Sequence, residues 1–252
     1  MNKIDCLNAG NIQIRIIYDN KLACDKFKAA WGFACLIKLP DHTILFDTGG
    51  DAEIFISNLK AMNIDISTID SVMISHDHWD HNAGMEALFN LNSKLQLYII
   101  KSFSDKTKAI AESAGVKTLF ATEPTAITPG ALTTGEMATN RPDLFEHSLI
   151  LRTDKGSIII TGCAHSGIVE VIERCKALIA DDILFVIGGF HLVESSEAEI
   201  SEIIDRCKQY DIRFMAPCHC TGDNAIEMFR KSLGKRFISI GAGTVINISD
   251  LV

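Results

Sequence analysis

The apolar residues of the chain recur at two spacings, every second residue and every third or fourth residue. Residues 11–18 place Ile12, Ile14 and Ile16 on one side, which predicts an amphipathic strand. Further strands are predicted at 33–39, 43–46, 69–75, 95–100, 116–120, 131–137, 148–152, 157–161, 182–187, 212–216, 236–240 and 244–248. Helical spacing predicts helices at 51–62, 105–114, 166–179 and 196–207. Two more helices are predicted: one has Asn82 as its N-cap and carries Leu88 on its apolar face, and the other carries Phe229.

Two features of this pattern indicate how the elements assemble. Strands alternate with helices in the second half, while hairpins occur in both halves, at 33–46 and 148–161. This mixture predicts an α/β fold of two mixed sheets packed together with helices outside. The segment 123–141 is rich in Thr, Pro and Gly and is expected to be largely loop that walls a site. With only 5 prolines and no linker-like run, residues 1–252 are expected to form one domain.

Four potential metal ligands lie close together in the turn after the predicted strand 69–75. They are His76, His78, Asp80 and His81, within the run Ser-His-Asp-His-Trp-Asp-His-Asn. In a nearly extended turn, residues two apart point the same way, so we expect His76 and His78 to bind one ion and Asp80 and His81 another. Imidazole and carboxylate ligands predict two divalent ions, zinc first, with iron or manganese as alternatives.

This run resembles the signature of the metallo-β-lactamase superfamily of dinuclear metal hydrolases. The resemblance implies a four-layer αββα sandwich. Within the superfamily, the chain resembles the subgroup named for 7,8-dihydropterin-6-methyl-4-(β-D-ribofuranosyl)aminobenzene-5′-phosphate synthase. The motifs that carry this resemblance are Asp-Thr-Gly-Gly at 47–50, the metal run at 75–81, Thr-Gly-Cys-Ala-His-Ser-Gly at 161–167, Gly-Gly-Phe-His at 188–191 and Pro-Cys-His-Cys-Thr-Gly at 217–222.

Histidines recur at the ends of later predicted strands and complete the expected ligand set. The resemblance puts His219 beside Asp80 and His81, although Cys218 and Cys220 alternatively predict a separate metal clip. His165 is expected as the third ligand beside His76 and His78, because its strand-end position matches that of the other ligand turns. The alternative is His147, since most of the superfamily has this histidine before the hairpin.

Two further residues are expected next to the ligands. Asp47 ends a strand before two glycines, and the resemblance assigns it to support a ligating histidine through a hydrogen bond. The superfamily has a bridging aspartate in a Thr-Gly-Asp turn, whereas this chain has Cys163. Three outcomes stay open for Cys163: it binds weakly, it lies outside the coordination sphere, or a water alone bridges the ions.

The ligand set predicts hydrolysis by a hydroxide that bridges the metals and needs no protein nucleophile. Asp80 is then both ligand and catalytic residue, and His191, which follows two glycines, is predicted to contact substrate or to protonate a leaving oxygen. A buried core histidine is the other interpretation of His191. The expected substrate is a small anionic molecule, a phosphoester or a pterin-related compound.

Composition restricts the partners and the compartment. The formal net charge is −8, with 24 basic and 32 acidic residues and no basic stripe, so a nucleic acid partner is not expected. Residues 1–5 lead into no apolar export signal, and the apolar runs are too short to span a membrane, so we expect a cytoplasmic protein with its eight cysteines reduced. The alternative function is a metal-bearing binding or redox sensor protein in which Cys163, Cys218 and Cys220 respond to oxidation.

Overall fold

Two mixed β-sheets form the centre of the computed structural model, which describes residues 5–252. Residues 1–4, part of the start used to predict the lack of an export signal, lie outside this range. The first sheet has the order β15-β1-β2-β3-β4-β5-β6 and the second β14-β13-β12-β11-β8-β7. The strands of the first sheet are β1 (Gln13–Tyr18), β2 (Ala34–Lys38), β3 (Thr43–Phe46), β4 (Ser71–Met73), β5 (Gln96–Ile99), β6 (Lys117–Phe120) and β15 (Val245–Asn247).

The second sheet and a small ribbon contain the remaining strands. In the second sheet they are β7 (Ala126–Thr128), β8 (Ala131–Thr133), β11 (Leu149–Thr153), β12 (Gly156–Thr161), β13 (Ile183–Gly189) and β14 (Phe214–Cys218). The ribbon pairs β9 (Met137–Ala138) with β10 (Phe145–Glu146). The helices are α1 (Ala52–Ala61), α2 (Trp79–Asn82), α3 (Met85–Leu91), α4 (Asp105–Ser113), α5 (Ile168–Leu178), α6 (Glu197–Lys208) and α7 (Asp223–Leu233).

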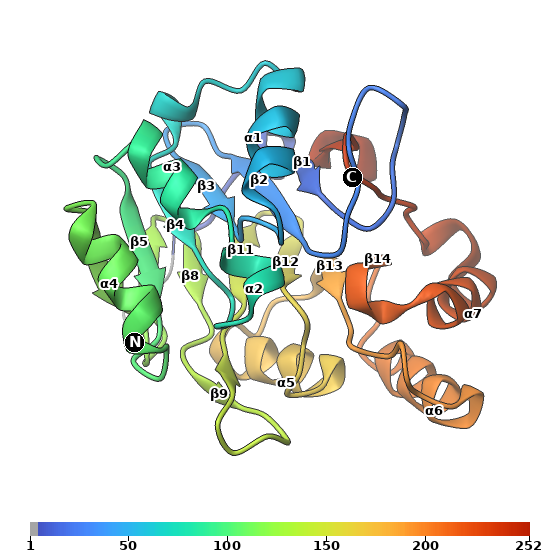
Figure 1. Ribbon diagram of the computed structural model, residues 1–252. Coiled ribbons are helices and arrows are strands. Elements are labelled where there is room, and N and C mark those ends of the chain that lie inside the picture. Colours follow the sequence, from blue (N-terminus) through green and yellow to red (C-terminus); the bar gives the residue numbers. More distant parts are fainter. Residues whose placement is uncertain (1–4) are drawn as a thin grey trace.

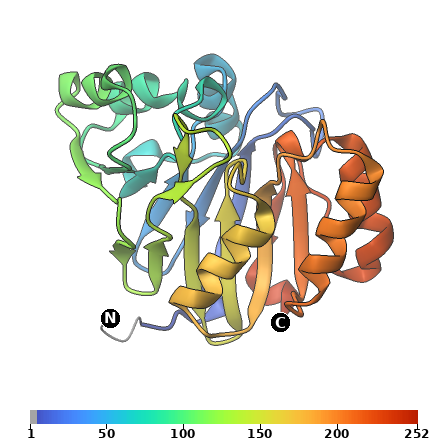
Figure 2. The ribbon, with the colours of Figure 1, turned by 90° about the horizontal axis from the view of Figure 1, so that it is seen from below.

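The core consists of three apolar layers that separate four layers of secondary structure. Along β12, Ile158 and Ile160 face the first sheet, whereas Ile159 between them packs under α5–α7. On the other side, α1, α3 and α4 cover the outer face of the first sheet (Figure 1), and residues such as Phe55 and Leu88 pack there. Figure 2 shows α5 and α6 lying along the second sheet. The predicted αββα sandwich is therefore confirmed.

Three local predictions are wrong. The predicted strand 236–240 is not regular structure, because Gly234–Arg236 forms a 3₁₀ turn and only Phe237 bridges to β14. Asn82 lies inside α2, and α3 starts only after Gly84, which packs against Thr48. The helix predicted from position 166 begins at Ile168, since the hydroxyl of residue 166 bonds to a glutamate instead.

The carboxyl ends of five strands meet at one edge of the sandwich. β3 and β4 run parallel in the first sheet, and β12, β13 and β14 run parallel in the second. Each of these strands is followed by one of the candidate site segments. None of the helices within residues 5–252 combines the length and apolar character needed to cross a membrane.

Candidate metal centre

The turn after β4 brings two imidazoles together with one from the second sheet. His76 Nε2 lies 3.0 Å from His78 Nδ1 and 3.3 Å from His165 Nε2. His76 and His78 leave the end of β4, and His165 follows β12, so both sheets contribute. We call His76, His78 and His165 the first group.

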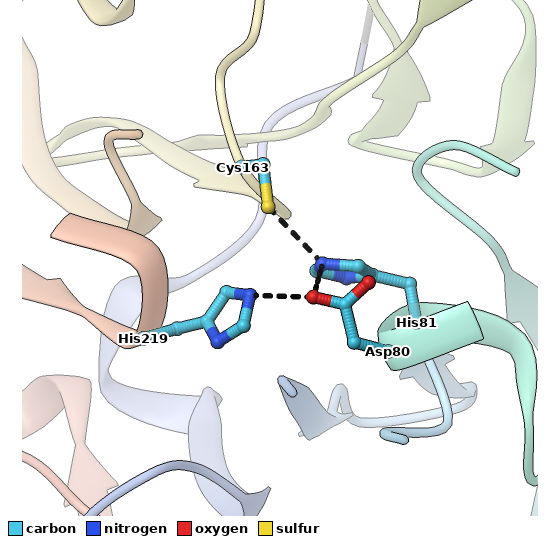
Figure 3. Close-up of side chains that lie close together, drawn as sticks. All are labelled: Asp80, His81, Cys163 and His219. Carbon is cyan, nitrogen blue, oxygen red and sulfur yellow. Dashed lines mark hydrogen bonds and ion pairs between the residues drawn. The ribbon is translucent and has the colours of Figure 1, made fainter. Parts of the chain in front are cut away.

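A second group forms beside it from the other half of the same turn (Figure 3). The short helix α2 places Asp80 and His81 side by side, and Asp80 Oδ2 lies 3.7 Å from His81 Nε2. His219, which follows β14, puts its Nε2 3.3 Å from the same carboxylate oxygen. Asp80, His81 and His219 therefore also draw on both sheets. That the turn divides its ligands between two metal positions stays a prediction.

Cys163 lies between the two groups. Its Sγ is 3.1 Å from His81 Nε2, and Figure 3 shows it pointing at that ring. Ligand atoms of Cys163, Asp80, His81 and His219 all lie within 4.8 Å of one another, and the same holds for Cys163, His76 and His165. Cys163 thus has the geometry of a shared ligand, and burial raises the pKa of its thiol.

His147 lies away from both groups. Its side chain is fully buried, and its Nε2 is 2.8 Å from the carbonyl oxygen of Ile74. Burial lowers the pKa of His147 to about 4, so the ring is neutral. Of the two residues considered as the third ligand, the structure brings His165 and not His147 beside His76.

Asp47 connects the two groups from behind. Its carboxylate accepts hydrogen bonds from the Ser75 backbone N–H at 2.7 Å and the Ser75 hydroxyl at 2.8 Å, and it lies 2.7 Å from His81 Nδ1. The Ser75 oxygen is also 2.9 Å from His76 Nδ1. Because the hydroxyl proton goes to Asp47, the Nδ1 proton of His76 must go to Ser75. This network leaves the Nε2 lone pairs of His76 and His81 directed into the site.

The backbone around the site is held in an unusual conformation. Asp47, Ala164, His191 and His219 have φ values of 59°, 54°, 52° and 50°. Non-glycine residues rarely adopt this left-handed region, and such strain gathers at functional sites. Four of the six non-glycine residues with positive φ in the described part of the chain lie in these strand-end turns.

The electrostatics of the site suit a cation. Burial and the neighbouring imidazoles lower the pKa of His76, and the same causes lower that of His165 to about 3. Burial raises the pKa of Asp80, but the nearby His219 and His81 reverse this and hold it well below its usual range. His219 Nε2 is buried and makes no hydrogen bond within residues 5–252, even though Asp80 is close. The neutral His76 and His165 rings, the charged Asp80 carboxylate and the unsatisfied His219 nitrogen together fit a divalent metal ion such as zinc.

A cavity of about 490 Å³ opens onto the two groups. His191 is exposed at its wall, with its ring centroid 4.1 Å from that of His165, so the alternative of a buried core histidine is wrong. Asn140 and Arg141, from the segment predicted to wall the site, line the same cavity.

The two cysteines of the alternative metal clip have different partners. Cys220 lies with Cys163 and His191, with all three ligand atoms within 4.8 Å of one another, whereas Cys218 interacts with Asp19. The alternative Cys218–Cys220 metal clip is therefore not formed.

Several supporting residues were not predicted. Trp31 and Asn20 contact Asp80 and His219 from the segment before β2, and Glu146 accepts hydrogen bonds from the backbone N–H groups of His165 and Ser166. Burial raises the pKa of Glu146. From the sequence, only His147 of the Glu146-His147 pair was considered as a site residue. Nothing in the local sequence around Trp31 indicated a role.

Comparisons with known proteins agree with this architecture. The family model described as anti-Pycsar protein Apyc1 matches residues 25–118. The chain is 29% identical to the 7,8-dihydropterin-6-methyl-4-(β-D-ribofuranosyl)-aminobenzene-5′-phosphate synthase of Methanocaldococcus jannaschii, over 87% of this chain and 90% of that protein. Among solved structures, Tm1679, a metal-dependent hydrolase of the β-lactamase superfamily, matches with a TM-score of 0.78 at 25% identity, covering 93% of this chain and 98% of the other. The metallo-β-lactamase fold protein YhfI from Bacillus subtilis matches with a TM-score of 0.70 at 13% identity over 93% and 98% of the two chains.

Proposed function

We propose that this chain, which has the metallo-β-lactamase fold, is a single-domain hydrolase that binds two divalent metal ions and acts on a small anionic substrate. One observation carries the proposal: two groups of ligand atoms, each drawn from both sheets, lie beside one cavity, and Cys163 is close to both groups and lines that cavity. A paired site of this kind is typical of enzymes that hydrolyse phosphoryl and acyl compounds.

Each residue has a distinct task in this proposal. His76, His78 and His165 would hold one ion, Asp80, His81 and His219 would hold the other, and Cys163 would be a shared ligand. When bound, the two ions lower the pKa of a water molecule toward neutrality and polarise the substrate oxygen. Asp47 keeps the Nδ1 proton of His81 in place, so that Nε2 stays available as a ligand. His191, exposed on the cavity wall, is positioned to donate a proton to a leaving oxygen.

The ligand chemistry and the cavity favour a metal and a substrate class. Imidazole and thiolate ligands suit zinc, while Asp80 also allows iron or manganese. Arg141 at the cavity wall supplies positive charge for an anionic group on a chain of net charge −8. The similar Methanocaldococcus jannaschii protein is named as a synthase of a phosphate-bearing pterin compound, which supports phosphoester or pterin-related substrates. The eight free thiols fit a cytoplasmic protein.

The test combines metal analysis with a substrate panel. Protein purified without added metal is expected to contain two metal ions per chain and to hydrolyse at least one member of a panel of phosphomonoesters, phosphodiesters, thioesters and lactams. His81→Ala should lose about one ion and most of the activity, because it removes a ligand. His42→Ala is the matched control, since His42 lies at the opposite end of β4, near Ser71. Retention of both ions and full activity in His81→Ala would refute the proposal.

A second candidate function rests on the three-residue set of Cys163, His191 and Cys220. Two thiols this close allow a metal-bearing sensor in which hydrogen peroxide oxidises one sulfur to a sulfenic acid and the other displaces water to form a disulfide. Peroxide treatment would then lower the mass by two hydrogens, and Cys220→Ser would abolish this change. A metal-loaded protein that hydrolyses nothing in the panel but shows this mass change would favour the sensor.

A further inference from the structure

The loop that joins β1 to β2, residues 19–33, contacts two of the three residues of the second group. Asp19 begins this loop, and its buried carboxylate accepts a hydrogen bond from the His219 backbone N–H at 3.2 Å. Near its end, the Phe33 N–H donates to the Asp80 carbonyl oxygen at 3.3 Å. One segment of the first sheet thereby holds a ligand from each sheet.

Asn20 fixes the orientation of the His219 ring. Its Oδ1 accepts a hydrogen bond from the Gly32 N–H at 3.1 Å, which identifies this amide atom as the oxygen because a backbone N–H can only donate. The same Oδ1 lies 3.0 Å from His219 Nδ1, so that nitrogen must carry the proton. The Asn20 Nδ2 donates to the His219 carbonyl oxygen at 3.1 Å. His219 Nε2 is therefore unprotonated in the neutral ring and faces Asp80.

Trp31 holds the other ligand. Its indole Nε1–H donates to Asp80 Oδ2 at 2.9 Å, the same oxygen that faces His219 Nε2. The Trp31 and His219 ring centroids are 5.1 Å apart. Gly32 makes this approach possible, because its φ is +143° and a Cβ at this position would lie 2.6 Å from the Asp80 carbonyl oxygen. Trp31 remains 43% exposed and also lines the cavity.

The first group has different support. The His76 ring donates to Ser75, and the His165 and Ser166 backbone N–H groups donate to Glu146. These contacts come from the strand ends and not from residues 19–33. A change in the β1–β2 loop should consequently affect one metal position more than the other.

We propose that the β1–β2 loop is the positioning element of the second metal position, where Asn20 sets the tautomer of His219 and Trp31 orients the Asp80 carboxylate. This inference rests on the proposed function, in that it assumes an ion bound by Asp80, His81 and His219. Asn20 and Trp31 are positioning residues, because they act through the ligands. Their contribution should appear in metal affinity before it appears in catalysis.

Titration of the full-length, metal-free protein with Co²⁺ tests the proposal, with the visible absorption of bound cobalt as the readout. The second position is identified as the equivalent that His219→Ala abolishes. Asn20→Leu, which has similar size but no acceptor, and Trp31→Phe, which keeps an aromatic ring but no N–H, should each weaken this equivalent about 10- to 100-fold. Asn20→Asp should recover most of the affinity, because a carboxylate also accepts the His219 Nδ1 proton.

Trp79 offers a matched control. It is the only other tryptophan, it lines the same cavity, and its ring packs over Gly50. Trp79→Phe should bind both Co²⁺ equivalents with wild-type affinity. This variant also leaves Trp31 as the sole tryptophan, so quenching of its fluorescence should follow occupancy of the second position.

The outcomes separate this inference from the proposed function. Unchanged affinities in Asn20→Leu and Trp31→Phe, or equal losses at both positions in proteins with wild-type circular dichroism, overturn the positioning role. A wild-type protein that binds a single Co²⁺ refutes the paired centre instead. In that case the positioning role is tested by the binding of the single ion. It is overturned unless Asn20→Leu and Trp31→Phe both weaken that binding.

Discussion

At the residue scale, the side chains behind the ligands decide which nitrogen of each histidine is available to a metal. Asp47 accepts three hydrogen bonds, two from Ser75 and one from His81. Through Ser75 it also acts on His76. One carboxylate therefore controls a ligand of each metal position, which makes it the residue whose loss should affect both.

Asp47→Asn tests this coupling. An amide at this position presents N–H groups to donors, so we expect a 10- to 100-fold loss of affinity for both Co²⁺ equivalents, measured by titration. Asp105→Asn, at an exposed site on α4, is the control and should bind as wild type does. Wild-type affinity at either position in Asp47→Asn would show that the hydrogen-bonded network does not couple the two.

His147 permits a prediction about pH. Burial lowers its pKa in the folded protein from 6.5 to about 4, so between these values the unfolded chain binds more protons than the folded chain. The contribution of neutral His147 to the free energy of unfolding is fully present above pH 6.5 and is lost as the pH falls toward 4. This contribution is at most about 3 kcal/mol. Unfolding by urea with a metal chelator present should show a shallower loss between pH 6.5 and 4 in His147→Gln than in wild type. If the free energy of unfolding fell equally steeply with pH in both proteins, the lowered pKa assigned to His147 would be contradicted.

The residue scale also marks the limit of sequence-based prediction. Four ligand candidates lie within one turn, so residue type and spacing were enough to propose them. The strand-end position favoured His165 over His147, and the structure shows why His147 is unsuitable, since its ring is buried against the Ile74 carbonyl oxygen. Asn20 supports His219 across 199 positions and Trp31 supports Asp80 across 49, and no local pattern reveals such partners.

At the element scale, local signals worked where the interactions are local. Ser196 and Glu199, three residues apart at the predicted helix start, form a capping box of α6 with both hydrogen bonds present. The strand predicted at 236–240 failed although its residues favour strands, because the 3₁₀ turn at Gly234–Arg236 occupies its start. The predicted start of α3 was wrong because Gly84, just before the helix, packs against Thr48, a contact between distant segments.

Ser196→Ala should therefore destabilise the protein. Loss of an N-cap side chain typically costs about 1 kcal/mol, and the free energy of unfolding from urea denaturation measures it. Ser201→Ala, an exposed position inside α6, is the control and should cost nothing, since alanine is favoured in helix interiors. Metal content should be unchanged in both variants, because α6 packs on the outer face of the second sheet. Equal stability of the two variants would show that the box adds nothing.

At the scale of the whole molecule, the sandwich is what makes the site. The pattern of strands, helices and hairpins predicted two mixed sheets with helices outside, and the resemblance implied the four-layer αββα sandwich that the structure has. The sequence could not indicate how closely the ends of β4, β12 and β14 approach one another. This approach puts first-sheet ligands within 3.3 Å of second-sheet ligands in both groups, at His76–His165 and at Asp80–His219.

Because each proposed metal position spans both sheets, metal binding should cross-link the two halves of the fold. An ion at 1,000 times its dissociation constant stabilises the folded state by about 4 kcal/mol, so chelation of wild-type protein should lower the melting temperature measurably. A double variant, His165→Ala with His219→Ala, should lose this metal dependence although the four ligands on the β4 turn remain. His42→Gln, a histidine on the first sheet near Ser71, should keep it in full. If the double variant were stabilised by metal as strongly as wild type, the β4 turn alone would bind the ions and the second sheet would have no part in the centre.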